Sequence, residues 1–343
     1  MEDIKLSVVI PVHKTPVEKL RRALKSTAKL TIAHETIVVF DGAPEVALLD
    51  AVNSFGKDVV RYSVIQRIGH AEARNAGIAR NVGIREAAGE WIAFLDADDE
   101  IIAEGMQDLV LYGDENGCQL VQGKYIKRMN ASTEECAMSN RPCIYRGGAV
   151  REFLRTIFLA DKGTGTVWSK IFRRSYLIDH RIGFGSDLAI EDTPFMFDAT
   201  RNMLCIGFIP VDCYSYYRNE GSLVTSFRKD YAECIATYLI QFKKRVDKLS
   251  DAQVSTAFDQ YVVFYLLLVM LHYVFNPQND WTTQRQHAEF DSLLHFDLYR
   301  NALARTNGQD MSLSKRISVY VLKHHMFRVM KVICNIRNMQ IRK

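Results

Sequence analysis

The chain has 343 residues, more than one ordinary domain holds, and its 48% hydrophobic and 24% charged residues describe a globular rather than a disordered protein. A net charge of +4 without a recognised nucleic-acid motif speaks against nucleic acid as a partner. Seven cysteines form no CxxC pair, and the start MEDIK differs from a secretory leader, so we expect a cytoplasmic protein with reduced thiols.

The first hundred residues alternate strand and helix patterns. Strands are predicted over 6–12, 35–44, 59–66 and 90–99, and helices over 17–30 and around the duplicated hexapeptide of 73–84, ARNAGIARNVGI. Apolar strands joined by helical crossovers predict an α/β fold with a doubly wound, mainly parallel sheet. Ligands of such sheets bind beyond the carboxyl ends of the strands.

Acidic residues follow two of these predicted strands. Asp41 ends the second, and Asp96, Asp98 and Asp99 follow the fourth. Asp41 alone could be an ordinary turn residue. Three carboxylates within four residues repel one another unless a cation binds there, and their oxygen ligands suit Mg²⁺ or Mn²⁺.

The run ARNVGIREAAGEWIAFLDADD (79–99), with SVVIPVHK and VVFDGA upstream, resembles the inverting family 2 glycosyltransferases of GT-A fold. The resemblance implies a metal-assisted transferase that binds a nucleotide-sugar donor through the first half of the chain. It also implies substrate contacts for Pro11, Val12, Asp41, Arg80, Asp96, Ala97 and Asp98, with Asp41 at the base of the nucleotide. Phe40 stands where the family has a further acid, which leaves the nucleotide open.

The two hexapeptide copies are not equivalent. A six-residue step on a helix turns the side chain by about 240°, so Arg74 and Arg80 point in different directions. Only the second copy, with Asn81 and Gly83, has the family's spacing from the aspartates. We therefore expect Arg80 to contact the nucleotide and Arg74 to lie on the helix surface or near a phosphate. The alternative is that both arginines only solvate a helix face.

The segment EDTPF (191–195) predicts the start of a helix, with Thr193 as N-cap and Pro194 as first helical residue. The helix dipole should favour ionised carboxylates at Glu191 and Asp192. The resemblance implies that Asp192 is the catalytic base, with Glu191 as the second candidate, and that Trp168 and Lys170 lie on the substrate side. Without the resemblance, both acids could serve only the helix end.

The run VDCYSYYRNEGSLVTS (211–226) predicts a strand with one packed aromatic face. It resembles the family's tyrosine-rich strand, which would bring Tyr217, Arg218 and Ser222 toward the donor phosphates.

The mechanism implied is one displacement with inversion at the anomeric carbon. The acceptor would be a glycan or a lipid-linked glycan. Two alternatives remain open: a nucleotidyltransferase, and a non-catalytic subunit that binds nucleotide sugars.

The C-terminal third has a helical pattern, so we predict a catalytic domain over 1–230 and a helical region over 231–343. The apolar run of 261–275 is shorter than a membrane span and predicts a buried or interfacial helix. After Met311 there are eight Lys or Arg residues and no acid, with an apolar stripe through Val319, Leu322, Met326, Val329, Ile333 and Ile336. This tail could bind an anionic membrane at the inner face of the cell membrane, pack on the protein, or join a homo-oligomer.

Overall fold

The structure is a computed structural model, and it describes residues 3–56, 59–65, 76–129, 132–136, 138–159, 164–185, 190–217, 227–306, 308 and 310–341. The chain forms two compact units, one of Met1–Ile157 with Lys162–Arg218 and one of Phe158–Asp161 with Asn219–Lys343. The predicted division into a catalytic domain over 1–230 and a helical region over 231–343 stays a prediction.

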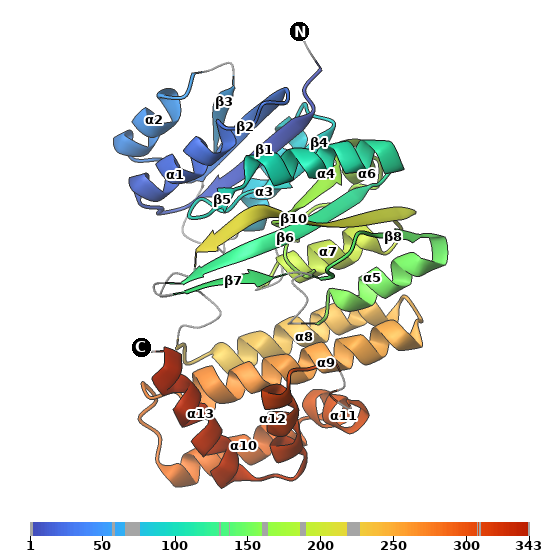
Figure 1. The fold of residues 1–343 in the computed structure, drawn as a ribbon. Coiled ribbons are helices and arrows are strands. Elements are labelled where there is room, and N and C mark those ends of the chain that lie inside the picture. The colour runs from blue at the N-terminus through green and yellow to red at the C-terminus, as the bar shows by residue number, and fades with distance from the viewer. Residues whose placement is uncertain are drawn as a thin grey trace. The chain divides into compact units, whose positions relative to one another are not determined.

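The first unit contains the sheet (Figure 1). Its strands are β1 (Leu6–Val12), β2 (His34–Asp41), β3 (Val60–Ile65), β4 (Trp91–Phe94), β5 (Glu100–Ile101), β6 (Leu120–Met129), β7 (Ser132–Cys136), β8 (Cys143–Arg146), β9 (Lys170–Arg173) and β10 (Cys205–Tyr217). Its helices are α1 (Val17–Thr27), α2 (Val46–Asn53), α3 (Ala76–Glu86), α4 (Ala103–Asn116), α5 (Val150–Thr156), α6 (Arg174–Asp179) and α7 (Asp192–Thr200), with a 3₁₀ turn, η1, at Gly147–Ala149.

The strand order along the sheet is β3-β2-β1-β4-β9-β6-β10-β5. Strands β3, β2, β1 and β4 are parallel, as predicted, because helical crossovers connect them. Beyond β4 the directions are mixed: β9 is antiparallel to both β4 and β6, and β10 is parallel to β6. The α/β fold predicted from the sequence is confirmed.

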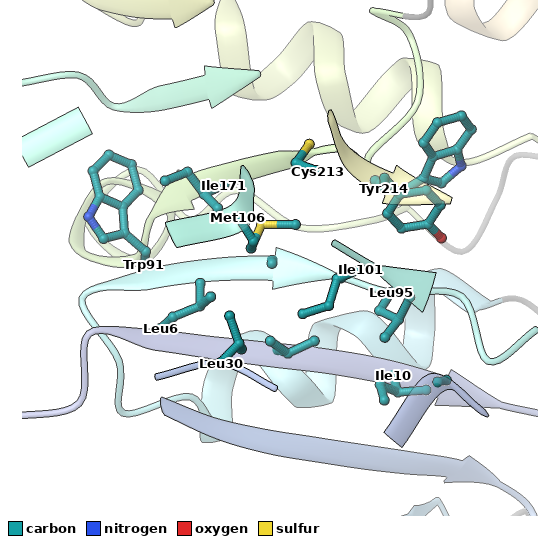
Figure 2. Close-up of a cluster of buried hydrophobic side chains, with 14 of the residues drawn as sticks. Leu6, Ile10, Leu30, Trp91, Leu95, Ile101, Met106, Ile171, Cys213 and Tyr214 are labelled. Atoms are coloured by element: carbon teal, nitrogen blue, oxygen red, sulfur yellow. The ribbon is translucent and has the colours of Figure 1, made fainter. Parts of the chain in front are cut away.

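Helices cover both faces of the sheet. Alternate β1 residues point to opposite faces, so β1 contributes side chains to the packing on each side. Leu6, Val8 and Ile10 belong to a buried cluster that includes Leu20 and Leu24 of α1. Figure 2 shows part of this cluster, in which Leu6 and Ile10 lie with residues of the later strands such as Tyr214. Val9 points to the other side, where α3 packs.

The second unit consists of helices in its described part. They are α8 (Tyr231–Asp247), α9 (Ala252–Val269) with the π-helical turn η2 (Met270–Val274), α10 (Thr283–His295), α11 (Asp297–Arg305), α12 (Leu313–Lys323) and α13 (Phe327–Ile341). Among the described residues, the continuous helix Ala252–Val274 is long and apolar enough to cross a membrane by length and composition, with 67% of its apolar window buried. Val262 and Leu266 near its centre are fully buried, whereas Phe264 is partly exposed, which agrees with the buried or interfacial helix predicted there.

Candidate active site

Several strands end at one edge of the sheet. The parallel strands β1, β2 and β4 end at Val12, Asp41 and Phe94, and the aspartates at 96, 98 and 99 follow β4 directly. Strand β9 begins at this edge, because it runs antiparallel to β4 with Ile171 opposite Ala93. The strand topology therefore gathers acidic loop residues where an α/β sheet binds its ligands.

Arg80 of α3 is the centre of the site. Its guanidinium donates from NH1 to Glu191 at 3.0 Å and to Asp192 at 2.9 Å, and from NH2 to Asp96 at 2.7 Å. The Arg80 side chain is only 4% exposed. One buried cation thus connects the acidic run after β4 with the two acids at the start of α7, which lie more than a hundred residues beyond Arg80 in the chain.

Residues next to Arg80 in the segment ARNVG (79–83) hold the Arg80 side chain and its helix in place. Asn81 donates from Nδ2 to the carbonyl of Phe184 and accepts from the Phe184 N–H, both at 2.8 Å. The Phe184 ring lies 5.3 Å from the Arg80 guanidinium carbon. A side chain at Gly83 would clash with Val9, because an added Cβ would lie 2.2 Å from Val9 Cγ1. Arg80, Asn81 and Gly83 of this segment therefore each have a packing or hydrogen-bonding reason.

The pKa values of the two acids at the start of α7, Glu191 and Asp192, are raised. Burial raises the pKa of Glu191 to about 7, against the opposing effect of Arg80. Burial also raises the pKa of Asp192, again opposed by Arg80. Burial would lower the pKa of Arg80, but Asp192, Asp96 and Glu191 together raise it. These shifts run against the expectation that the start of the helix favours ionised carboxylates at Glu191 and Asp192, because desolvation is the largest influence on both pKa values.

The three aspartates after β4 have different surroundings. The Asp98 side chain is 39% exposed and lies 3.9 Å from Lys19 Nζ. Burial and the charge of Asp96 raise the pKa of Asp98. Asp99 is 1% exposed, and burial together with Asp96 raises its pKa to about 8.

Both carboxylate oxygens of Asp99 accept hydrogen bonds. Tyr214 donates its hydroxyl at 2.8 Å, and the Tyr217 N–H donates at 2.7 Å. Tyr214 in turn accepts from the Asp96 N–H at 3.2 Å. Asp99 therefore ties the acidic run to β10.

The carboxylate oxygens at this edge of the sheet are ligands of the kind that a divalent cation binds. Asp96 and Asp98 supply carboxylate oxygens whose mutual repulsion a cation would relieve. Within the described ranges, no group of three or more His, Cys, Asp or Glu side chains is arranged to hold a metal. Two carboxylates are enough for Mg²⁺, which commonly takes one or two from the protein and the rest of its ligands from substrate phosphates and water.

Trp168 and Lys170 lie close to this network. The Trp168 ring stacks on Tyr214, with ring centroids 4.9 Å apart, and on Tyr216 at 5.5 Å. Lys170 is fully buried and donates to Thr166 Oγ1 at 3.3 Å and to the Trp168 carbonyl at 3.4 Å. Burial lowers the pKa of Lys170 to about 7, while Cys213 and Asp192 oppose that shift.

The remaining predicted residues lie at neighbouring strand ends. Asp41 Oδ2 lies 3.8 Å from His13 Nδ1. Pro11 is partly buried and Val12 and Ala97 are buried. Their substrate roles stay predictions, and Arg74, Arg218 and Ser222 lie outside the described residues.

The predicted N-cap at Thr193 is wrong. Helix α7 begins at Asp192, Glu191 takes the N-cap position, and no side chain caps the helix. The Thr193 hydroxyl instead donates to the Gly165 carbonyl at 3.4 Å, and Arg80 holds the two acids. Pro194 still fits, because the first turn of a helix needs no N–H donors.

Sequence reasoning missed Lys19 and Arg22 of α1. Arg22 donates to the Asp98 carbonyl, and its guanidinium lies 3.8 Å from the centre of the Tyr217 ring. Lys19 pairs with the Asp98 carboxylate. Their spacing of three residues on the first helix after a strand was the available signal, because it places both on one helix face.

Comparison with known proteins gives consistent matches. Residues 7–180 match the model of glycosyl transferase family 2. EpsH of Bacillus subtilis is 26% identical over 340 residues, which cover 95% of this chain and 93% of EpsH. The poly(ribitol-phosphate) beta-N-acetylglucosaminyltransferase TarP of Staphylococcus aureus is 30% identical over 125 residues, 35% of this chain and 36% of TarP.

Solved structures of S. aureus TarS share the fold. TarS 1–349 in complex with UDP-GlcNAc superposes with a TM-score of 0.63 at 20% sequence identity, over 98% of this chain and 92% of that one.

Proposed function

Because the chain belongs to glycosyl transferase family 2 and is a glycosyltransferase, we propose that it moves a sugar from a nucleotide-diphosphate donor to a hydroxyl of a glycan or lipid-linked glycan, with inversion. The observation that carries this proposal is the Arg80 cluster. Arg80 holds Asp96, at the end of a central strand, beside Asp192, at the start of a distant helix. A donor-binding carboxylate and a proton acceptor are thereby within reach of one substrate pair.

Asp192 is proposed as the general base. A carboxylate whose pKa is raised by burial accepts a proton more readily than an exposed one. Arg80 acts as a positioning residue in this scheme, since its NH1 group fixes Asp192 Oδ1 and its NH2 group fixes Asp96 Oδ1. The other Asp192 oxygen would accept the proton of the acceptor hydroxyl, which attacks the anomeric carbon from the face opposite the leaving group.

Asp98 and Asp96 are proposed to hold a Mg²⁺ or Mn²⁺ ion. When bound, this cation would offset negative charge on the leaving nucleoside diphosphate. Asp99 is the third predicted ligand, but its two oxygens already accept hydrogen bonds from β10. We therefore assign Asp99 to holding the loop shape and the metal contacts to the other two aspartates.

Arg80 Nε is buried and has no hydrogen-bond partner within the described part of the chain. The nucleotide contact predicted for Arg80 would use this group or the second N–H of NH2, since the other three guanidinium N–H donors bond to carboxylates. UDP-GlcNAc, the ligand of the similar TarS structure, is the first donor to test.

The test is donor binding by the whole chain. Isothermal titration of nucleotide sugars, with Mg²⁺ or with a chelator, should show binding that requires the cation. Asp98→Ala should weaken this binding, whereas Asp108→Ala, an exposed acid of α4, should leave it unchanged. Equal binding with and without cation would remove the metal from the proposal, and binding without any transfer or hydrolysis would favour a non-catalytic subunit.

A further inference from the structure

Helix α12 carries an exposed apolar stripe. Leu313, Ile317 and Tyr320 are 70%, 50% and 60% exposed. Their steps of four and three residues place them on one face of the helix. The opposite face, with Val319 and Leu322, is buried in the helical unit.

Helix α13, which follows directly, also has an exposed apolar face and a buried face. Val329, Val332, Ile336 and Met339 are 38%, 56%, 47% and 59% exposed, at steps of three, four and three residues. Phe327 packs inward against Phe275 and Phe290. About half of the surface of these four side chains is therefore uncovered in the described structure.

The single stripe predicted from the sequence is wrong. Val319 and Leu322 are buried, whereas Val329 and Ile336 are exposed. The reason is the break between the helices: His325 adopts a φ of 52°, and Met326 N–H bonds to the Val321 carbonyl, which ends α12. The new helix starts with a different rotation, so the two helices present separate exposed stripes.

The charged residues that α12 and α13 themselves carry have one sign. From 311 to 341 the described chain contains Lys315, Arg316, Lys323, Arg328, Lys331 and Arg337 and no Asp or Glu. Some of these side chains also contact the helical unit, since Lys323 donates to the Thr306 carbonyl and Lys331 to Thr283. Arg316, Arg328 and Arg337 are exposed.

We propose that the exposed faces of α12 and α13 bind the surface of an anionic lipid bilayer. Exposed aliphatic stripes flanked by basic residues are what inserts at the boundary between headgroups and acyl chains. A second copy of the chain fits less well, because a two-fold contact would bring this all-basic face against itself. Nucleic acid would be held by the basic groups and would leave the apolar stripes without a partner.

The test is flotation of the full chain with vesicles. Vesicles of phosphatidylcholine with about 30% phosphatidylglycerol should bind the protein, and pure phosphatidylcholine should bind it far less. Arg316→Gln with Arg328→Gln and Arg337→Gln should lower the binding constant about a hundredfold. The apolar variant, Ile317→Ser with Val332→Ser and Ile336→Ser, should lower it about tenfold or more.

The matched control changes three exposed basic residues in α1 or just after it, Arg21→Gln with Lys25→Gln and Lys29→Gln, and should bind as the parent does. Equal vesicle binding by all variants, or none by the parent, overturns the proposal. A dimer that the apolar variant dissociates, seen by sedimentation without vesicles, identifies a second copy as the partner instead. Donor binding without vesicles is measured on the same variants, so failure here and failure of the proposed transferase are told apart.

Discussion

At the scale of residues, Arg80 determines the charge balance of the site. It is nearly buried, and three carboxylates converge on it. Removing one partner from a buried ion network leaves the others uncompensated. The positions of Glu191 and Asp192 relative to Asp96 therefore depend on a single side chain, while Asn81 and Phe184 hold that side chain in place.

The assignment of the base leads to the first prediction. Asp192→Asn should keep donor binding and lower kcat by a factor of about a hundred or more, because the amide cannot accept the proton. Glu191→Gln is the comparison, since it removes the other acid on the same Arg80 nitrogen. Initial rates of nucleotide release measure both. A larger loss in Glu191→Gln than in Asp192→Asn would transfer the role of base to Glu191.

Lys170 gives a prediction about stability and pH. Its pKa is about 7 in the folded protein and 10.5 ordinarily, because burial disfavours its charge. Between pH 7 and 10.5 the unfolded chain holds a proton that the folded chain has lost, so the free energy of unfolding rises with pH in this window. The whole difference is at most about 5 kcal/mol.

Lys170→Met should remove this part of the pH dependence. The variant should be more stable than the parent at pH 7, and the gap should close toward pH 10. Urea unfolding at several pH values measures it, with Lys25→Met on the exposed face of α1 as the control. A gap that stays constant with pH would mean that Lys170 keeps its charge in the folded protein.

At the scale of elements, the sequence predicts the first four strands and two of the helices between them, α1 and α3, because local pattern decides them, whereas α2 was not predicted. Strand β1 has the predicted bounds, and β2 and β3 differ by a few residues. The mixed directions beyond β4 are not readable locally, since the pairing of β9 between β4 and β6 joins residues far apart in the chain. The predictions for the site divide in the same way, into residues found from a local motif and contacts set by the packing of distant segments. Asp192 was found through a motif, whereas the contact of Arg22 with Asp98 depends on how α1 packs.

The approach of α3 to β1 leads to a further prediction. Gly83→Ala should destabilise the protein by about 1–3 kcal/mol, because the new methyl group would overlap Val9. Val9→Ala alone should also destabilise it, by leaving a cavity. The double variant should recover much of the loss, which a double-mutant cycle of unfolding free energies measures.

Gly148→Ala is the control for this pair, since an added Cβ there meets nothing within 4 Å. Additive losses in the double variant would show that Gly83 and Val9 do not constrain each other.

At the scale of the whole molecule, the chain divides into a sheet-containing unit and a helical unit. The aspartates, Arg80 and the α7 acids all belong to the first, and the exposed stripes of α12 and α13 belong to the second. The proposed substrate site and the proposed membrane contact thus belong to separate parts of the sequence.

Because the chain divides into two compact units, we predict two transitions when its unfolding is followed by calorimetry. A nucleotide sugar with Mg²⁺ should raise the Tm of one transition only, because a ligand stabilises the part that binds it. The Ile317→Ser, Val332→Ser and Ile336→Ser variant should leave that ligand-dependent shift unchanged. A single transition that shifts as a whole would show that the two units unfold together.

The stacking of Trp168 on Tyr214 gives the chain an optical signal of its own. Tyr214 donates to Asp99, so we expect a cation or nucleotide bound at the aspartates, as proposed, to alter the surroundings of the indole through one intervening ring. The other two tryptophans are elsewhere, Trp91 under Arg173 and Trp281 beside Tyr273 of the helical unit. Replacing these two by phenylalanine isolates the emission of Trp168, so that donors can be ranked by fluorescence with unlabelled protein before any acceptor is identified.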